Sequence, residues 1–415
     1  MKKEGEGSSM KKYPISFWCG PPHDKAREEE VIKEIAEAGM TVMEARYDAK
    51  TNKRVIELAA KYGMKTSVLD DRIYAALNGE DGWEAQLESF VNDYKDLPTV
   101  DNYFLQDEPT EVAFPALRRV KDKLSQLDPA HKALVNLLPI PPVVDVEHYE
   151  LYLREFVNVF EPEILSYDHY NLMYREVERL TDQPEANLSE ENRTTNGWVG
   201  KLYEKYNRPT FLDNLELVRQ VAQEKKIPWK IIVLCVEHWV YRNVNESEIR
   251  WQVFNSLAYG PMEIDYFTYW TPAGNAEGWD YHNAIINLGG TKNSRYYIVQ
   301  RVNKDLALLG AEIVDAQSEE VLHIGFEPGD KLVRYFTGYK ALTQVDARAL
   351  TLGFFDNGRI LLANKDMENS QSVSFTFDGQ PEHLNKNSGK WEQMSLADDG
   401  RYHLCIAAGD GEMIR

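Results

Sequence analysis

Two glutamates, Glu108 and Glu237, each close a short apolar run that is typical of a buried β-strand. The first ends the segment 103–108 and the second ends the segment 229–237. Glycosidic bond cleavage commonly uses two carboxyl groups, of which one donates a proton and the other attacks the sugar or activates water. The charge of Glu237, which ends the apolar run 231–236, would be largely desolvated and needs either a partner or a function. We therefore predict that these two residues are the catalytic pair of a glycosidase.

Each glutamate also has a purely structural explanation. Glu108 precedes a helix expected from about Thr110, where an acid stabilises the first turn. Against this explanation, Pro109 fixes the backbone after Glu108, which favours a Glu108 side chain held at the rim of the barrel. Glu237 could instead pair with a nearby arginine, Arg242 or Arg46.

The elements that must position these residues follow an alternating order from residue 13 to residue 316. Helical patterns separate eight β-type runs, at 13–19, 41–46, 65–70, 103–108, 132–138, 164–170, 229–237 and 263–270. Strict alternation requires parallel strands with right-handed crossovers, and eight such units close into a barrel. An open doubly wound sheet is the alternative, but Pro21 and Pro22 stand where it would carry a glycine-rich phosphate turn. We predict a (β/α)8 TIM barrel over 13–316.

The pattern changes at both ends of this region. From 317 to 415, short alternating runs are broken by Asp-Asn-Gly, Asp-Gly and Asp-Asp-Gly turns, which predicts a C-terminal antiparallel β-sandwich. Residues 1–12 are expected to be a flexible tether. A polar insertion from 175 to 196 separates the sixth and seventh strands and is expected to border the cleft.

In a barrel of this kind the site lies where the strands end. Carboxylates and aromatic residues outnumber basic residues there, a mixture that suits the hydroxyls and flat C–H faces of sugars. By strand alternation, Asp107 should point to the opposite face from Glu108, and Trp270 should form the floor under one sugar ring. The predicted substrate-binding residues are Arg46, Asp70, Asp107, Asn136, Asp168, His169, Tyr170, His238, Trp239 and Trp270.

With these positions placed, the chain resembles the clan of retaining β-glycoside hydrolases built on a (β/α)8 barrel. In that clan the acid/base glutamate ends strand four, often in Asn-Glu-Pro, and the nucleophile ends strand seven. The triplet Asp107-Glu108-Pro109 is similar to the first motif, and Glu237 stands where the second belongs. Asp107 replaces the asparagine that contacts the 2-hydroxyl of the sugar in the clan.

Three further positions are similar to supporting residues of the clan, namely Arg46, Tyr170 and Trp270. The resemblance implies hydrolysis of a β-linked glycoside or polysaccharide by double displacement, with Glu108 as acid/base and Glu237 as nucleophile. It also implies a separation of about 5–5.5 Å between the two carboxyl groups.

The composition of the chain argues against several classes of binding partner. A formal net charge of −20 over 415 residues disfavours nucleic acid and anionic membrane surfaces. The three cysteines show no C-x-x-C spacing and H-E-x-x-H is absent, so we expect no disulfide framework, metal or cofactor. No stretch reaches the roughly 18 apolar residues that span a bilayer. The start lacks the apolar core of a signal peptide, so the expected compartment is periplasmic or cell-surface if a signal was removed, and otherwise cytoplasmic.

Two other functions fit the same residues. A carbohydrate-binding protein on a barrel scaffold would keep the aromatic residues and lose the geometry at one carboxylate. A barrel lyase or isomerase would use Asp168 or His169 as a base, and a metal requirement would support it. The sequence does not indicate the sugar, the linkage, endo or exo action, or the oligomeric state.

Overall fold

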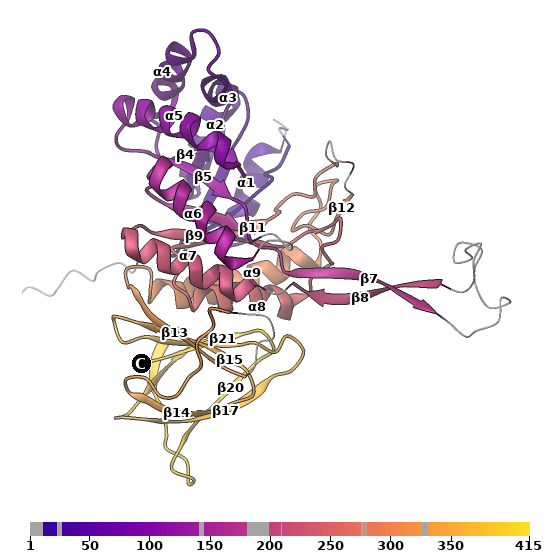
Figure 1. Ribbon diagram of the computed structural model, residues 1–415, viewed down its shortest axis with the longest axis vertical. Helices are drawn as coiled ribbons and strands as arrows, with labels where there is room; N and C mark the ends of the chain where they lie inside the picture. Colours follow the sequence, from indigo (N-terminus) through magenta and orange to yellow (C-terminus); the bar gives the residue numbers. More distant parts are fainter. Residues whose placement is uncertain are drawn as a thin grey trace, which may run out of the picture.

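An eight-stranded parallel sheet curls into a barrel in the computed structural model (Figure 1). The model describes residues 11–22, 27–140, 145–180, 199–208, 210–274, 278, 280–325 and 331–415. The order in the sheet is β1-β11-β9-β6-β5-β4-β3-β2, and β1 meets β2 where the N–H of Thr41 donates to the carbonyl of Ile15 over 2.8 Å. The strands are β1 (Ile15–Phe17), β2 (Val42–Ala45), β3 (Lys65–Val68), β4 (Val100–Asp107), β5 (Lys132–Leu137), β6 (Leu165–Asp168), β9 (Trp229–Leu234) and β11 (Glu263–Phe267).

Amphipathic helices cover the outside of this sheet (Figure 1). In α2, for example, Asp48 caps the first turn, and Val55, Ile56 and Ala59 form the buried face. The helices are α1 (Glu28–Glu37), α2 (Ala49–Lys61), α3 (Asp71–Asn78), α4 (Trp83–Tyr94), α5 (Phe114–Leu127), α6 (Val146–Phe160), α7 (Phe211–Lys225), α8 (Glu246–Leu257) and α9 (Ser294–Ala311), with a short 3-10 turn η1 (Glu111–Ala113) before α5. The predicted (β/α)8 barrel is confirmed.

All eight predicted strands end one to three residues earlier than the sequence indicated, and the difference is largest for the last two. The seventh barrel strand, β9, ends at Leu234 rather than Glu237, and the eighth, β11, ends at Phe267 rather than Trp270. The apolar run continues past β9 through Cys235 and Val236, which are both fully buried outside the sheet ladder. Hydrophobicity therefore reports burial beyond the last paired residue of the strand, so it places the strand end too late.

The insertion after the sixth barrel strand contains an antiparallel ribbon that the sequence pattern did not indicate. It is formed by β7 (Leu172–Leu180) and β8 (Val199–Asn207), and it points away from the barrel in Figure 1. Residues 181–196 of the predicted polar insertion lie outside the described residues, as do residues 1–10 of the predicted tether.

Two antiparallel sheets follow α9, and their facing apolar side chains form a separate core. This arrangement confirms the predicted sandwich. One sheet has the order β13-β15-β16-β21-β18-β19 and the other β14-β17-β20. The strands are β13 (Ser318–Ile324), β14 (Leu342–Asp346), β15 (Leu350–Phe355), β16 (Ile360–Asn364), β17 (Gln371–Phe377), β18 (Glu382–Asn385), β19 (Lys390–Gln393), β20 (Tyr402–Ile406) and β21 (Gly411–Ile414).

The larger of these sheets packs closely on the barrel helix α8. A Cβ added at Gly353 of β15 would lie 2.1 Å from the carbonyl oxygen of Ala258, so only glycine allows this approach. Trp251 of α8 also donates from Nε1 to the carbonyl of Lys365 over 3.0 Å. Among the described helices, none is both long and apolar enough to cross a bilayer.

Candidate active site

Glu108 follows the last residue of β4 in a left-handed backbone conformation, with φ of 43°. This conformation is uncommon for a residue other than glycine. The N–H of Glu108 still donates to the carbonyl of Asn136 on the neighbouring strand, over 2.8 Å. The change of backbone direction interrupts strand alternation, so Asp107 and Glu108 both line one cavity. The prediction that Asp107 points to the opposite face was therefore wrong.

This cavity has a volume of about 640 Å³ and lies at the carboxyl ends of the barrel strands. Its wall combines acids, two arginines and many aromatic rings. The charged and polar residues that line it are Arg46, Asp107, Glu108, Asn136, Asp168, Arg208 and His238. The aromatic residues are Trp18, Tyr170, Trp239, Tyr241, Phe267 and Tyr281.

Asn136 of β5 connects the acids of two neighbouring strands. Its Nδ2 donates to Oδ1 of Asp107 and to Oδ1 of Asp168, each over 3.0 Å. The Oγ of Ser166 donates to Oδ1 of Asn136 over 2.9 Å, which fixes the orientation of the amide. Asp168 in turn is hydrogen-bonded to the carboxyl group of Glu108. We call Asp107, Glu108 and Asp168 the mouth cluster.

The mouth cluster holds protons more strongly than isolated acids do. Loss of bulk water and then the charge of Asp107 raise the pKa of Glu108 to about 7. Although its side chain is open to the cavity, protein surrounds it on most sides, so its charged form is poorly hydrated. Asp168 is fully enclosed, and burial followed by the charges of Glu108 and Asp107 raises its pKa well above the usual range. The Glu108–Asp168 pair therefore shares a proton near neutral pH.

Arg46 and His238, which were both predicted as site residues, line the cavity, Arg46 as part of an ion pair and His238 as a neutral imidazole. The guanidinium of Arg46 pairs with Glu44 over 2.7 Å and lies 4.2 Å from the ring of Trp18 and 4.1 Å from that of Phe104. Burial lowers the pKa of His238 to about 4, so its imidazole is neutral at physiological pH.

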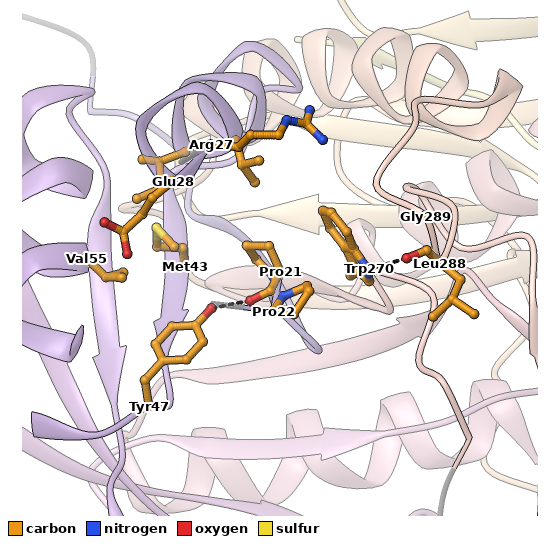
Figure 2. A pocket seen from close by; sticks show the side chains of 12 residues that line it. Pro21, Pro22, Arg27, Glu28, Met43, Tyr47, Val55, Trp270, Leu288 and Gly289 are labelled. Carbon is orange, nitrogen blue, oxygen red and sulfur yellow. Dashed lines mark hydrogen bonds between the residues drawn. The ribbon is translucent and has the colours of Figure 1, made fainter. Parts of the chain in front are cut away.

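Three other predicted binding residues lie outside this cavity. Asp70 lines a different depression, where it caps α3 and pairs with Arg72 over 2.6 Å. His169 is completely buried, and burial lowers its pKa to about 3. Trp270 lines a separate cavity of about 240 Å³ beside Pro21, and its Nε1 donates to the carbonyl of Leu288 over 3.2 Å (Figure 2). Phe267, rather than Trp270, forms the aromatic wall contributed by the eighth strand.

Glu237 is not among the residues that line the cavity. It lies on the two-residue strand β10 (Glu237–His238), which pairs antiparallel with β12 (Tyr281–His282). Neighbouring side chains of a strand point in opposite directions, and here His238 faces the cavity. The Oε2 of Glu237 accepts a hydrogen bond from Nδ2 of Asn283 over 2.9 Å. The suggested arginine partners pair elsewhere, since Arg46 contacts Glu44 and Arg242 contacts Glu248.

Sequence reasoning missed several residues of the cavity, among them Trp18, Arg208, Phe267 and Tyr281. Trp18 and Phe267 stand at the ends of barrel strands, so a more exact strand boundary would have found them. Arg208 follows the ribbon strand β8, and Tyr281 lies on β12. Both come from connections whose path no sequence periodicity indicates. Among the described residues, no group of three or more potential ligands is arranged to hold a metal ion.

Similar solved structures include a β-galactosidase from Bacillus circulans sp. alkalophilus, with 11% identity, a TM-score of 0.58 and coverage of 97% of this chain and 98% of that one. A GH42 β-galactosidase from G. stearothermophilus has 8% identity, a TM-score of 0.55 and the same coverage of 97% and 98%. A β-galactosidase from the Antarctic haloarchaeon Halorubrum lacusprofundi has 11% identity and a TM-score of 0.47 over 71% of this chain, which spans 58% of its length. A scan against protein-family models and a search of curated proteins each found no match. The chain thus shares its architecture with barrel glycoside hydrolases, as the sequence resemblance implied.

Proposed function

We propose that the protein hydrolyses a β-linked glycoside and that Glu108 is its general acid. The observation that carries this proposal is the hydrogen-bonded pair of Glu108 and Asp168 in an aromatic-walled cavity at the carboxyl ends of the barrel. A carboxyl group with a pKa of about 7 remains partly protonated at neutral pH, as proton donation to a leaving oxygen requires. The architecture shared with β-galactosidases supports the same reaction class.

In the proposed reaction, Glu108 transfers its proton to the glycosidic oxygen while the bond from that oxygen to the anomeric carbon breaks. Positive charge then develops on the sugar ring, and the negative charge left in the mouth cluster stabilises it. Glu108, now ionised, removes a proton from the incoming water and returns to its starting state. Asn136 holds Asp107 and Asp168 in place throughout.

The role of Glu237 as the nucleophile of a double displacement stays a prediction. Asp168 already lines the cavity, whereas Glu237 lies on the β10–β12 ribbon, where its carboxylate accepts a hydrogen bond from Asn283. The structure therefore supports the proton-donor role of Glu108 more strongly than the nucleophile role of Glu237, and the proposal requires only the former.

A panel of aryl β-glycosides tests the proposal with the wild-type protein, Glu108→Gln and Glu237→Gln. We expect the wild type to release the aryl group from at least one glycoside. Glu108→Gln should lose most of this activity, and the loss should be smaller for an acidic phenol that leaves without a proton. If Glu108→Gln keeps full activity toward poor leaving groups, the assignment of Glu108 is wrong.

The position of Glu237 outside the cavity favours a second candidate, a carbohydrate-binding protein without turnover. In that case no glycoside or polysaccharide is hydrolysed, and Glu108→Gln binds oligosaccharides as well as the wild type does. Calorimetric titration with the oligosaccharides of the panel distinguishes this candidate from the hydrolase.

A further inference from the structure

Asp107 and Glu108 are adjacent in sequence and yet line the same cavity. This arrangement depends on the left-handed conformation of Glu108, which turns two consecutive acids toward one space. An asparagine at position 107 could both donate and accept hydrogen bonds, whereas an ionised aspartate only accepts. The group that meets Asp107 must therefore be a donor.

Polar neighbours of Asp107 orient its carboxyl group to accept hydrogen bonds. Asn136 donates to Oδ1 of Asp107 over 3.0 Å, which orients the carboxylate. Burial raises the pKa of Asp107, and the hydrogen bond from Asn136 and the positive charge of Arg46 oppose part of this shift. Asp168 is placed differently, because it is fully buried and hydrogen-bonded to both Glu108 and Asn136. Of the three acids, Asp107 is the one suited to receive a substrate donor.

The second carboxylate expected for double displacement, Glu237, does not line the cavity. A glycoside with an acetamido group at C2 carries its own nucleophile, since the carbonyl oxygen of that group can attack the neighbouring anomeric carbon. As it attacks, positive charge develops on the amide N–H. A carboxylate that accepts this N–H stabilises the charge, whereas a neutral asparagine does so less.

We propose that the substrate is a 2-acetamido-2-deoxy-β-glycoside and that Asp107 holds its amide N–H while the acetamido oxygen displaces the leaving group. This inference rests on the proposed hydrolase function. In the first step a bond forms between the acetamido oxygen and the anomeric carbon, the glycosidic bond breaks, and Glu108 gives its proton to the departing oxygen. In the second step Glu108 takes a proton from water, the water oxygen bonds to the anomeric carbon, and the acetamido group is released intact.

Matched 4-nitrophenyl β-glycosides test this inference. We expect kcat/KM for the 2-acetamido-2-deoxy gluco or galacto substrate to exceed that of the parent with a 2-hydroxyl by about 100-fold or more. Replacing the acetyl group by trifluoroacetyl weakens the carbonyl oxygen as a nucleophile and should lower kcat on the order of tenfold or more. Asp107→Asn should lose activity toward the acetamido substrate. The control is Asp101→Asn, the same change at the opposite end of β4, where Asp101 pairs with Lys65.

Two outcomes overturn the inference and are distinguishable. Equal or faster hydrolysis of the 2-hydroxyl glycosides, together with covalent labelling of a protein carboxylate by a 2-deoxy-2-fluoro glycoside, rejects it and leaves the hydrolase function intact. Hydrolysis of neither series rejects the hydrolase function as well. A kcat that is insensitive to fluorination of the acetyl group also contradicts participation by the acetamido oxygen.

Discussion

Two clusters of acids in the barrel differ in whether a cation contacts them. The mouth cluster has a hydrogen-bonding neighbour in Asn136, but among the described residues no ion pair reaches it. The inner cluster consists of Lys230, Glu263 and Asp265, deep in the barrel. There the Nζ of Lys230 lies 2.5 Å from Oε1 of Glu263 and 3.2 Å from Oδ2 of Asp265.

The pKa shifts of the two clusters show what this difference means. Burial raises the pKa of Asp265 to about 6, and the next largest effect, the charge of Lys230, lowers it. Burial raises the pKa of Glu108 to about 7, and the next largest effect, the charge of Asp107, raises it further. The inner cluster is therefore compensated, whereas like charges are brought together at the mouth. Acids that raise one another's pKa in a cavity indicate a functional site.

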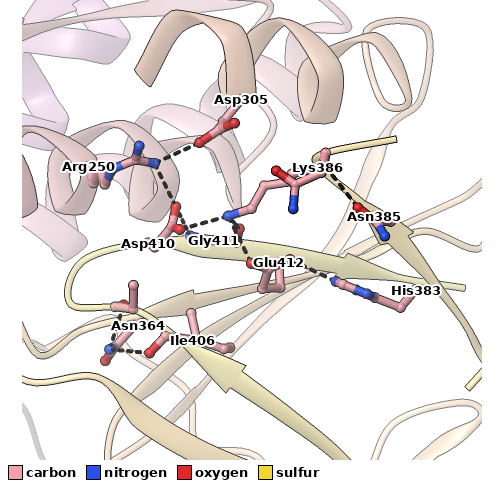
Figure 3. A network of polar contacts seen from close by, with 12 residues as sticks. Arg250, Asp305, Asn364, His383, Asn385, Lys386, Ile406, Asp410, Gly411 and Glu412 are labelled. Atoms are coloured by element: carbon pink, nitrogen blue, oxygen red, sulfur yellow. Dashed lines mark hydrogen bonds and ion pairs between the residues drawn. The ribbon is translucent and has the colours of Figure 1, made fainter. Parts of the chain in front are cut away.

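A third group of charges, at the contact with the C-terminal sheets, follows the pattern of the inner cluster (Figure 3). Arg250 of α8 contacts Asp305 over 2.8 Å and Asp410 over 3.1 Å. Lys386 contacts Asp410 over 2.7 Å and Glu412 over 2.8 Å. Cations and acids alternate through this contact, so its partly buried acids are paired.

The largest effect on activity should come from Glu108→Gln. Loss of the general acid should lower kcat toward an alkyl or oligosaccharide leaving group by about 10²–10⁴-fold. Steady-state kinetics on such a substrate measures the loss, and circular dichroism checks that the variant is folded. A loss that is equally large for an acidic phenol would point to misfolding or a different role.

The largest effect on stability should come from Lys230→Met in the inner cluster. Removing the cation leaves two buried acids without compensation, which should cost about 3–5 kcal/mol of unfolding free energy. Urea denaturation measures this loss. The control is Lys65→Met, because Lys65 pairs with Asp101 at the surface, where an ion pair contributes about 0–1 kcal/mol. Equal losses in the two variants would remove the distinction between the clusters.

The pH dependence of activity should reflect the mouth cluster. Because Glu108 must be protonated to act as an acid and its pKa is about 7, kcat/KM should decline above about pH 7. For a single ionisation the decline reaches about tenfold per pH unit. A profile that stays flat to pH 9 would show that no carboxyl group of this kind controls the reaction.

The smallest effect should be on stability as a function of pH. The pKa of Glu108 is raised above its unfolded value, so the folded state binds more protons than the unfolded state between the two pKa values. The contribution of Glu108 to stability should therefore fall as pH rises from about 4.3 to about 7. Glu108→Gln lacks this contribution and should gain stability relative to the wild type at pH 8 compared with pH 4.

Thermal unfolding at both pH values measures the difference. The control is Glu111→Gln, which makes the same change at an exposed residue of η1. The same pH-dependent gain in both variants would contradict a special environment for Glu108.

The sequence predicts the barrel well because each strand and helix carries a local periodicity that matches its burial. Glu108 was placed at the end of its strand for that reason. Asp107 was assigned to the wrong face because alternation assumes extended backbone, and the left-handed Glu108 breaks it. The end of β9 was set too late because Val236 is buried outside the ladder. Arg208 was missed because it reaches the cavity from a ribbon whose course depends on tertiary contacts.

The most direct test of the central claim is a titration of the Glu108 carboxyl carbon by NMR, with ¹³C-labelled glutamate and Glu108→Gln for assignment. The claim is that Glu108 holds a proton near neutral pH because its carboxyl group is poorly hydrated and lies beside the charge of Asp107. The predicted result is a titration near pH 7 that moves to lower pH in Asp107→Asn, where the charge of Asp107 is removed. A Glu108 signal that titrates near pH 4.5 in the wild type would contradict the claim.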